Sequence, residues 1–484
     1  MLTLGSITRD ACYVRHIQAR SELSARIGRS LAAHDQCTSI RLDWFLRSVV
    51  ADFPGYQTHR YALNSPGTPR ETLERLPILE KADLRELVDA VLRSPGCPQP
   101  DEAYWMEQEP DVPGEVECVL QGGPQRLWLA STTGSTGQPL TMVFDRRYFI
   151  SYFANWLCFL AQNGVESRPY ALSQLHVSGG EHRKSQPYQL LQPAVGYSLY
   201  RKVNIERNRW PGVAALVDSI TDESPDVLTG TPSRLEQLRA LLEERPPAQA
   251  LAPRLIMTSA ETLLPAARDR FQRVFGAPVF DQYGLTEVGG VVARECRAHA
   301  GYHVQSPDYI VEVIDPKGIA LRDEAEGELV VTNLFSRIVP IVRYRTGDFG
   351  VLTHTPCACG LVTPRIVRLT GRTITRFQLP DRRTISPFDE FGPLIGRLPV
   401  DQFQMVQHGS SEIVFSYKAV DAIDDLPDAR ALRDTVIRLF GDAVTFRIAR
   451  VKDFPHERKF ESWLRIDDQS DSSGTRGESR DCQQ

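Results

Sequence analysis

Residues 226–244 read DVLTGTPSRLEQLRALLEE, a short apolar run followed by an amphipathic helix, and this pattern decides the fold class. Ser233 is the predicted N-cap of the helix, and four leucines follow it at helical spacing. Two further apolar runs, 254–258 and 278–281, flank a second predicted helix that ends at Gly276. Strands that alternate with helices of about a dozen residues predict βαβ units and a mainly parallel sheet.

The chain on either side of this region has different sequence patterns. Residues 1–125 are predicted to form a helical lead-in, in which LPILEKADLREL at 76–87 is an extended segment followed by a helix. After about residue 301, alternating strand patterns predict an antiparallel or barrel-like β subdomain. Residues 371–466 have the pattern of a small α+β domain, and 467–484 are predicted to be a disordered tail. We therefore expect an α/β fold, with a large N-terminal domain of layered α/β and a small, mobile C-terminal domain.

The composition excludes several classes of protein. The 484 residues include 56 Lys and Arg against 61 Asp and Glu, so the chain lacks the basic surplus of a protein that neutralises nucleic-acid phosphates. The most apolar stretch, 149–160, is too short for a bilayer span, which needs about 20 apolar residues. No secretory signal is visible, so we expect a cytoplasmic protein. Nine cysteines, an odd number, argue against a disulfide framework and favour metal binding or catalysis.

A loop rich in glycine and hydroxyl groups, STTGSTGQP at 131–139, follows the apolar run 127–130. Two glycines three residues apart let the backbone turn tightly, and the hydroxyls between them can donate to phosphate oxygens. The Gly-Lys-Ser/Thr ending of a P-loop is absent, so a bound triphosphate must find its cation elsewhere. A plain linker is the alternative, but a linker does not normally lie between a buried strand and an aromatic helix.

Three further motifs follow in order, DQYGLTE at 281–287, RYRTGD at 343–348 and LTGR at 369–372. Each is weak alone, but together the set resembles the adenylate-forming superfamily of acyl-CoA synthetases, nonribosomal adenylation domains and luciferases. The lead-in motif, the loop without a trailing lysine and TSAE at 258–261 are most similar to the phenylacetate–CoA ligase-like branch. The resemblance covers about residues 70–465.

The resemblance implies a nucleotide site in an adenylate-forming large domain, residues 126–370. The residues that it assigns to ATP binding are Thr133, Gly134, Ser135, Thr136, Gly137, Ala260, Glu261, Gln282, Tyr283, Gly284, Asp348 and Arg372. Tyr283 would stack on adenine, and Asp348 would accept both ribose hydroxyls, which suits a carboxylate. Thr286 would touch the α-phosphate, and Glu287 would hold Mg²⁺. Core packing, a turn or a helix-terminal charge would explain each residue singly, but not the whole set.

The small domain is expected to supply a lysine to the reacting carboxylate and the α-phosphate. Lys459 lies where the family places this residue, and its long stem can reach a site that forms when domains close. The sequence departs from the family at Arg458, where glycine is usual, and at Thr373, where an acidic pair is common. A solvated basic loop is the alternative for Lys459, and the hinge residue stays open.

Three thiols and an imidazole form a third constellation, Cys296-x6-His303 with Cys357-x-Cys359. This set suits tetrahedral zinc, and similar members of the branch carry a structural zinc. His299 is a competing ligand. Reduced buried thiols near a surface histidine are the alternative.

The sequence thus predicts an AMP-forming acid–thiol ligase, which converts an aromatic or other small organic acid to an acyl-adenylate and transfers it to CoA. ATP, Mg²⁺, structural Zn²⁺ and CoA are the expected cofactors. A carrier-protein phosphopantetheine or an amine is the alternative acceptor. A non-catalytic nucleotide or acyl-AMP sensor is the alternative of another class, and a zinc-stabilised scaffold is a weaker one. We expect no nucleic-acid or membrane partner, and a monomer or homodimer.

Overall fold

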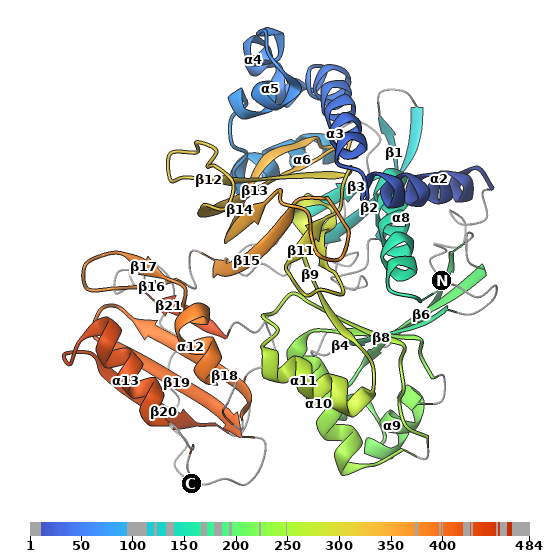
Figure 1. Ribbon diagram of the computed structural model, residues 1–484. Helices are drawn as coiled ribbons and strands as arrows, with labels where there is room; N and C mark the ends of the chain where they lie inside the picture. Colours follow the sequence, from blue (N-terminus) through green and yellow to red (C-terminus); the bar gives the residue numbers. More distant parts are fainter. Residues whose placement is uncertain are drawn as a thin grey trace. The chain divides into compact units, whose positions relative to one another are not determined.

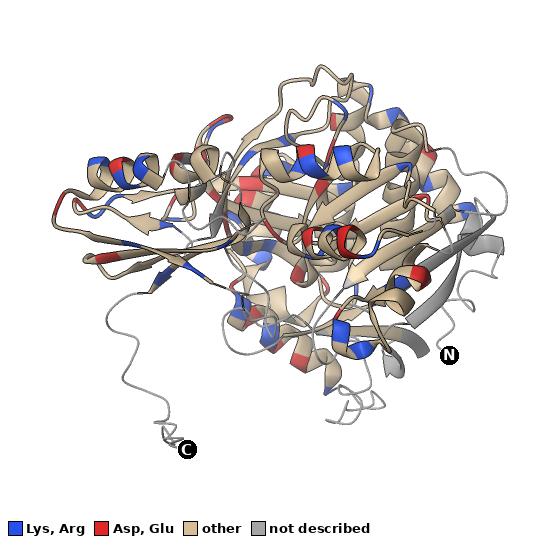
Figure 2. Ribbon diagram, turned by 90° about the horizontal axis from the view of Figure 1, so that it is seen from below, with Lys and Arg blue, Asp and Glu red and all other residues tan. Residues whose placement is uncertain are grey.

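A computed structural model describes residues 11–93, 114–120, 123–131, 140–165, 172–178, 186–192, 196–221, 224–247, 249–372, 376–395, 398, 400–419, 426, 429–451, 454 and 462–466. The chain forms two compact units that meet in sequence between Leu369 and Thr370. Within the described residues, no helix is both long enough and apolar enough to cross a membrane. Basic and acidic residues are interspersed on the described elements (Figure 2).

The first unit is built on a 12-stranded sheet with the order β12-β13-β14-β15-β11-β10-β9-β8-β7-β4-β6-β5 (Figure 1). Its parallel strands are β4 (Leu172–Ser178), β6 (Gly196–Asn204), β7 (Val227–Gly230), β8 (Leu255–Ser259) and β9 (Val279–Leu285). At one end β5 (Gln186–Gln192) pairs antiparallel with β6. The mainly parallel sheet expected around residues 226–281 is therefore confirmed.

Helices cover both faces of the parallel strands. Successive side chains of a strand point to opposite faces, so each strand packs against helices on both sides. Leu228 and its neighbours pack against α9 (Val213–Thr221), α10 (Pro232–Glu244) and α11 (Pro265–Phe275). Val227 and Phe280 belong to a cluster on the other face, with Trp156 and Phe159 of α8 (Arg146–Gln162).

Two helix ends test the predicted capping residues. Gly276 ends α11 in the left-handed conformation at φ 67°, as the sequence indicates. The N-cap of α10 is Thr231, not the predicted Ser233, because Pro232 occupies the first helical position. The Ser233 hydroxyl instead donates to Glu261 at 2.8 Å.

The chain after residue 286 continues the same sheet with antiparallel strands, which include the antiparallel pattern expected after about residue 301. They are β10 (Gly290–Glu295), β11 (Tyr302–Val304), β12 (Tyr309–Ile314), β13 (Glu326–Asn333), β14 (Ile341–Thr353) and β15 (Arg365–Arg372). β10 pairs with β9, so the antiparallel part joins the parallel part directly.

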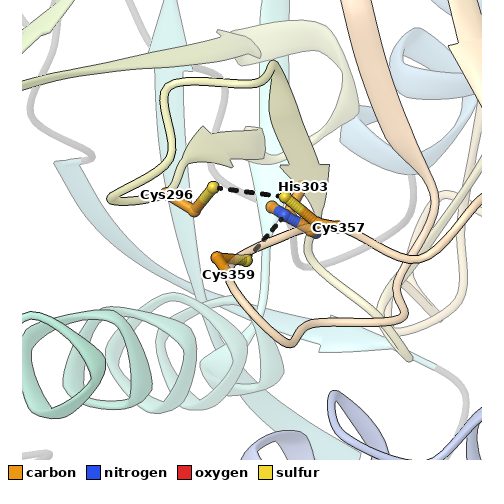
Figure 3. Close-up of side chains that lie close together, drawn as sticks. All are labelled: Cys296, His303, Cys357 and Cys359. Atoms are coloured by element: carbon orange, nitrogen blue, oxygen red, sulfur yellow. Dashed lines mark hydrogen bonds between the residues drawn. The ribbon is translucent and has the colours of Figure 1, made fainter.

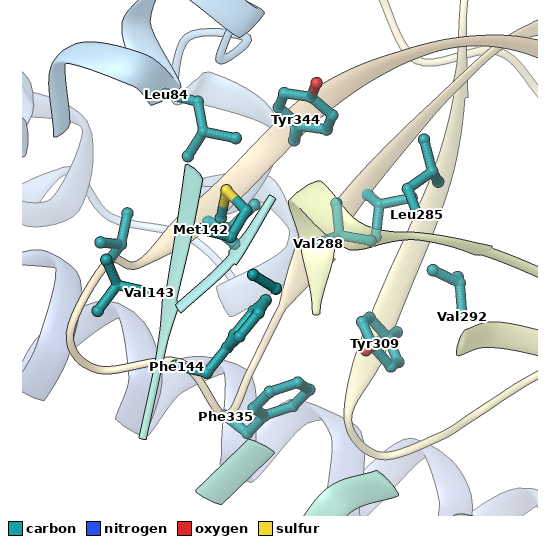
Figure 4. Packing of buried hydrophobic residues seen from close by; sticks show 14 of the residues in the cluster. Leu84, Met142, Val143, Phe144, Leu285, Val288, Val292, Tyr309, Phe335 and Tyr344 are labelled. Carbon is teal, nitrogen blue, oxygen red and sulfur yellow. The ribbon is translucent and has the colours of Figure 1, made fainter. Parts of the chain in front are cut away.

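The lead-in supplies helices, of which the first packs mainly on α8 and the others on this antiparallel part. Their bounds are α2 (Ala11–Ile27), α3 (Leu31–Phe45), α4 (Arg60–Asn64), α5 (Pro69–Arg75) and α6 (Lys81–Leu92). A small sheet follows, made of β1 (Gly114–Leu120), β2 (Gly123–Ser131) and β3 (Thr141–Phe144). Leu84 of α6, Met142 of β3 and Tyr344 of β14 share one buried cluster with Leu285 and Val288 (Figure 4). This core anchors α6 beside the end of β9.

The second unit has the small α+β pattern that the sequence predicts. Its elements are β16 (Phe377–Gln378), β17 (Thr384–Ile385), α12 (Pro387–Ile395), β18 (Val400–His408), β19 (Glu412–Ala419), α13 (Ala429–Phe440), β20 (Thr445–Arg450) and β21 (Trp463–Ile466). A four-stranded sheet has the order β20-β19-β18-β21. The domain boundaries at 125, 370 and 466 stay predictions.

Candidate functional site

The predicted adenine and ribose residues are in direct contact. The Tyr283 hydroxyl on β9 donates to Asp348 Oδ2 on β14 at 2.8 Å. Both residues are buried. The backbone N–H of Asp348 donates to Thr346 Oγ1 at 3.0 Å, and Gly347 between them takes the left-handed conformation at φ 75°. The turn therefore fixes the carboxylate beside the end of β9.

Thr286 and Glu287 follow directly in the short turn Thr286–Val288. Gly284 permits this turn, because a Cβ atom there would lie 2.4 Å from the carbonyl oxygen of Gly290 on β10. The Glu287 side chain is 15% exposed, so a ligand can reach its carboxylate.

A cation from the lead-in lies beside this carboxylate. Lys81 Nζ is 3.8 Å from Glu287 Oε1. Leu79, two residues before Lys81, pairs with β14. The Leu79 N–H donates to the Arg343 carbonyl, and the Leu79 carbonyl accepts from the Arg345 N–H, both at 3.0 Å. Lys81 was not among the residues predicted from the sequence. The sequence did contain a signal for it, because the lead-in motif at 76–87 has a lysine and the predicted phosphate loop at 131–139 has none.

Two other predicted nucleotide contacts already have partners in the protein. Glu261 accepts from the backbone N–H of Ser233 at 3.0 Å and from its hydroxyl, at the start of α10. Burial raises the pKa of Glu261. Gln282 accepts from Arg294 Nε at 3.2 Å. Ala260 takes the left-handed conformation at φ 68°. Their nucleotide-binding roles stay predictions.

Some predicted residues lie outside the described residues. They are Thr133, Gly134, Ser135, Thr136, Gly137, Thr373, Arg458 and Lys459. The backbone of Arg372 ends β15, but its side chain is outside the description. The roles of these residues stay predictions.

The four predicted zinc ligands come together (Figure 3). The ligand atoms of Cys296, His303, Cys357 and Cys359 all lie within 4.8 Å of one another. Cys296 Sγ is 3.8 Å from Cys357 Sγ, and Cys359 Sγ is 3.4 Å from His303 Nε2. His299 lies outside this group, and its Nδ1 is 3.5 Å from a Glu295 carboxylate oxygen. The competing ligand is thus not brought to the cluster.

The donor set fits zinc. At a Zn–S distance of about 2.3 Å, two sulfur ligands of a tetrahedral ion are about 3.8 Å apart, which matches Cys296 and Cys357. Burial, with a contribution from Arg365, lowers the pKa of His303 to about 4, so the imidazole is neutral at pH 7. Its Nδ1 lies 2.9 Å from Thr363 Oγ1, which leaves Nε2 beside the thiols.

Comparisons with known proteins identify the family of the chain. Residues 132–334 match the AMP-binding enzyme family. The chain is 34% identical over 348 residues to the phenylacetate–coenzyme A ligase of Aromatoleum evansii, which covers 69% of each chain. It is 32% identical over 158 residues to that of Thermus thermophilus, and this match spans 32% of the chain and about a third, 36%, of the Thermus enzyme.

A solved structure shares the whole fold. The crystal structure of 2-hydroxyisobutyryl-CoA ligase in the postadenylation state, in complex with R3-HIB-AMP, superposes with a TM-score of 0.66 at 19% identity, over 91% of each chain. That likeness concerns the fold, with its large N-terminal and small C-terminal domain. Since the Aromatoleum ligase shares more than two thirds of its length with this sequence, the chain belongs to the AMP-binding, adenylate-forming enzymes of the phenylacetate–CoA ligase-like branch.

Proposed function

We propose that the chain is a cytoplasmic AMP-forming ligase, which activates a carboxylic acid with ATP and transfers the acyl group to the thiol of CoA. The contact of Tyr283 with Asp348 carries this proposal. It brings the expected adenine and ribose residues together at the end of β9, where Glu287, the expected Mg²⁺ ligand, follows. Relatives named phenylacetate–coenzyme A ligase support CoA as the acceptor and an aromatic or other small organic acid as the substrate.

The reaction has two steps. The acid carboxylate attacks the α-phosphorus of ATP, and pyrophosphate leaves, which gives an acyl-adenylate. The thiol of CoA then attacks the acyl carbon, and AMP leaves. Asp348 would hold the ribose in both steps, which orients the α-phosphorus toward the acid. Thr286 would donate to the α-phosphate as its negative charge increases.

Glu287 would hold Mg²⁺, whose charge balances that of the phosphates when it is bound. Its carboxylate suits this hard cation. Lys81 would add the positive charge that the loop at 131–139 lacks, because its ammonium group already lies 3.8 Å from Glu287. Since Lys81 is only 32% exposed and its helix is anchored through Leu84, the charge is positioned before ATP binds.

We propose a structural zinc ion at Cys296, His303, Cys357 and Cys359. The cluster supports a structural role because four protein ligands complete a tetrahedral ion and leave no position for substrate. Zinc would tie the hairpin of β10 and β11 to the turn between β14 and β15.

Acid-dependent exchange of pyrophosphate into ATP tests the proposed function. A panel of aryl, arylacetic and short aliphatic acids is supplied with MgATP, and one acid class is expected to support exchange. Adding CoA should then give a thioester and AMP, which mass spectrometry detects. A carrier protein or an amine in place of CoA tests the alternative acceptors. Tight MgATP binding without exchange for any acid would contradict the proposal and favour a nucleotide sensor.

A further inference from the structure

Arg294 on β10 is an unusually placed charge. Its side chain is 2% exposed, in the interior of the first unit. Four arginines are buried in the described part of the chain, and two of them have a carboxylate partner, Arg239 with Glu236 at 2.7 Å and Arg343 with Glu312 at 3.3 Å. Arg365 donates to the carbonyls of Ala300 and Thr355 instead. Arg294 has no ion-pair partner among the described residues.

The contacts of Arg294 are all neutral. Nε donates to Gln282 Oε1 at 3.2 Å, and Nη1 donates to Gln305 Oε1 at 2.9 Å. Its Cζ lies 5.3 Å from the ring centre of Trp156 and 5.8 Å from that of Phe159. These ring faces attract a cation but carry no net charge. A guanidinium group has five N–H donors, so several of them lack an acceptor within the described residues.

Arg294 lines a partly open cavity of about 40 Å³, whose walls come from α2, α8, β10, β11 and the segment after Cys359. A water molecule needs roughly 10–15 Å³ of such space, so the cavity can hold a small molecule of a few atoms. Ser24, Asn155 and Gln162 add neutral polar groups to the wall. Glu295 is also on the wall, but its carboxylate accepts from Arg268 and from the Asp281 N–H, each at 2.8 Å.

We propose that this cavity binds a small anion of the size of chloride or formate, with Arg294 as its counter-charge. A buried charge without a partner is strongly unfavourable, and a cavity beside the guanidinium is where an anion can balance it. The Ser24 hydroxyl makes only a 3.5 Å contact with Asn155 Oδ1, so its one proton can be donated to the anion instead. The site is separate from the proposed reaction, and its test needs no substrate.

Thermal unfolding at constant ionic strength tests the site. Sodium gluconate, whose anion is too large for the cavity, is replaced stepwise by chloride or by formate. The unfolding midpoint should rise with the logarithm of the anion concentration once this exceeds the dissociation constant, by roughly 3–4 °C at a hundredfold excess. The anion whose rise begins at the lower concentration is the preferred ligand. Arg294→Met should abolish the rise, whereas Arg207→Met, which removes an exposed arginine, should retain it.

Bromide quenching of fluorescence provides a second test in the unaltered protein. Bromide bound at Arg294 would lie beside the buried Trp156 and quench it with a saturating dependence on concentration. The exposed Trp44 should give only a linear collisional component. Trp156→Phe should remove the saturating component. If Arg294→Met does not fold, bromide quenching of the unaltered protein and of Trp156→Phe still tests whether an anion binds at Arg294. A purely linear quench with an unchanged midpoint would overturn the proposal, as would an anion-dependent rise that survives in Arg294→Met.

Discussion

Asp348 combines burial with a fixed orientation, because Tyr283 donates to its carboxylate at 2.8 Å and Thr346 accepts from its N–H. We predict that Asp348→Ala nearly abolishes adenylation. The loss of charge-assisted contacts to ribose should cost about 2–4 kcal/mol, or roughly 30- to 900-fold in the rate of pyrophosphate exchange. Circular dichroism should show a folded variant. Exchange near the unaltered rate would refute the ribose assignment.

Lys81 is expected to act on the outer phosphates of the nucleotide. We predict that Lys81→Ala weakens MgATP binding roughly tenfold and leaves AMP binding unchanged. In the proposed site only the triphosphate would extend toward the Lys81–Glu287 pair. Calorimetric titration with each nucleotide measures the two affinities. Lys81→Arg should restore part of the loss, and Lys317→Ala, at an exposed turn, is the matched control. An equal loss for AMP would show that Lys81 acts only on the fold.

At the scale of the elements, local pattern could predict the parallel strands β7, β8 and β9, because each has its own apolar run and an adjacent helix. It could not predict that β10 joins β9, since this pairing depends on the close backbone approach at Gly284. The position of Lys81 beside Glu287 was missed for a similar reason, because the two residues lie more than two hundred positions apart. The zinc ligands could be grouped because their chemistry is distinctive.

The hairpin of β10 and β11 and the Cys357 turn should depend on zinc for their stability. We predict one tightly held zinc ion per chain, measured by elemental analysis of purified protein. Removal by a chelator should lower the unfolding midpoint, since a loss of even about 2 kcal/mol corresponds to roughly 3 °C for a unit of this length. Cys359→Ser should lower the zinc content, and Cys37→Ser, outside the cluster, should not. Little zinc in the protein and a midpoint that ignores the chelator would contradict the site.

Helices α2 and α3 are tied to α8 through Asp308, which is 1% exposed. Its carboxylate accepts from Arg20, from Arg41 at 3.2 Å, from Ser151 at 2.7 Å and from Asn155 at 2.9 Å. Burial alone would raise the pKa of Asp308, but the two arginines and the hydrogen bonds outweigh it, so the pKa is lowered.

We predict that Asp308→Asn lowers the free energy of unfolding by about 3 kcal/mol at pH 7, because it leaves two partly buried arginines without their partner. A carboxyl group with a lowered pKa stabilises the folded state fully above its unfolded pKa of about 3.9 and loses this effect as the pH falls. The difference between the two proteins in urea unfolding should therefore shrink below about pH 4. A difference independent of pH would show that the charge of Asp308 is not what matters.

At the scale of the whole molecule, the order of the motifs along the chain was enough to predict the family, because the ligands of one nucleotide must come from several loops at fixed places in the fold. The two units have separate sheets, of 12 and of four strands. The proposed chemistry requires both units, since the resemblance assigns Lys459 to the small domain. How one lysine serves only one of two half-reactions is therefore a question about the whole chain.

We predict that Lys459→Ala impairs adenylation strongly and hardly alters ATP affinity. Ground-state binding would rely on the large domain, whereas a lysine that meets the developing charge acts mainly in the transition state. Transfer from a preformed acyl-adenylate to CoA should survive, because the resemblance implies that the small domain turns away from this arrangement for the second step. Arg430→Ala, which removes a 91% exposed cation of the second unit, is the control and should leave both steps intact. Pyrophosphate exchange measures the first step, and thioester formation from synthetic acyl-adenylate measures the second. Equal loss in both steps, or no loss in the first, would mean that Lys459 does not serve adenylate formation selectively.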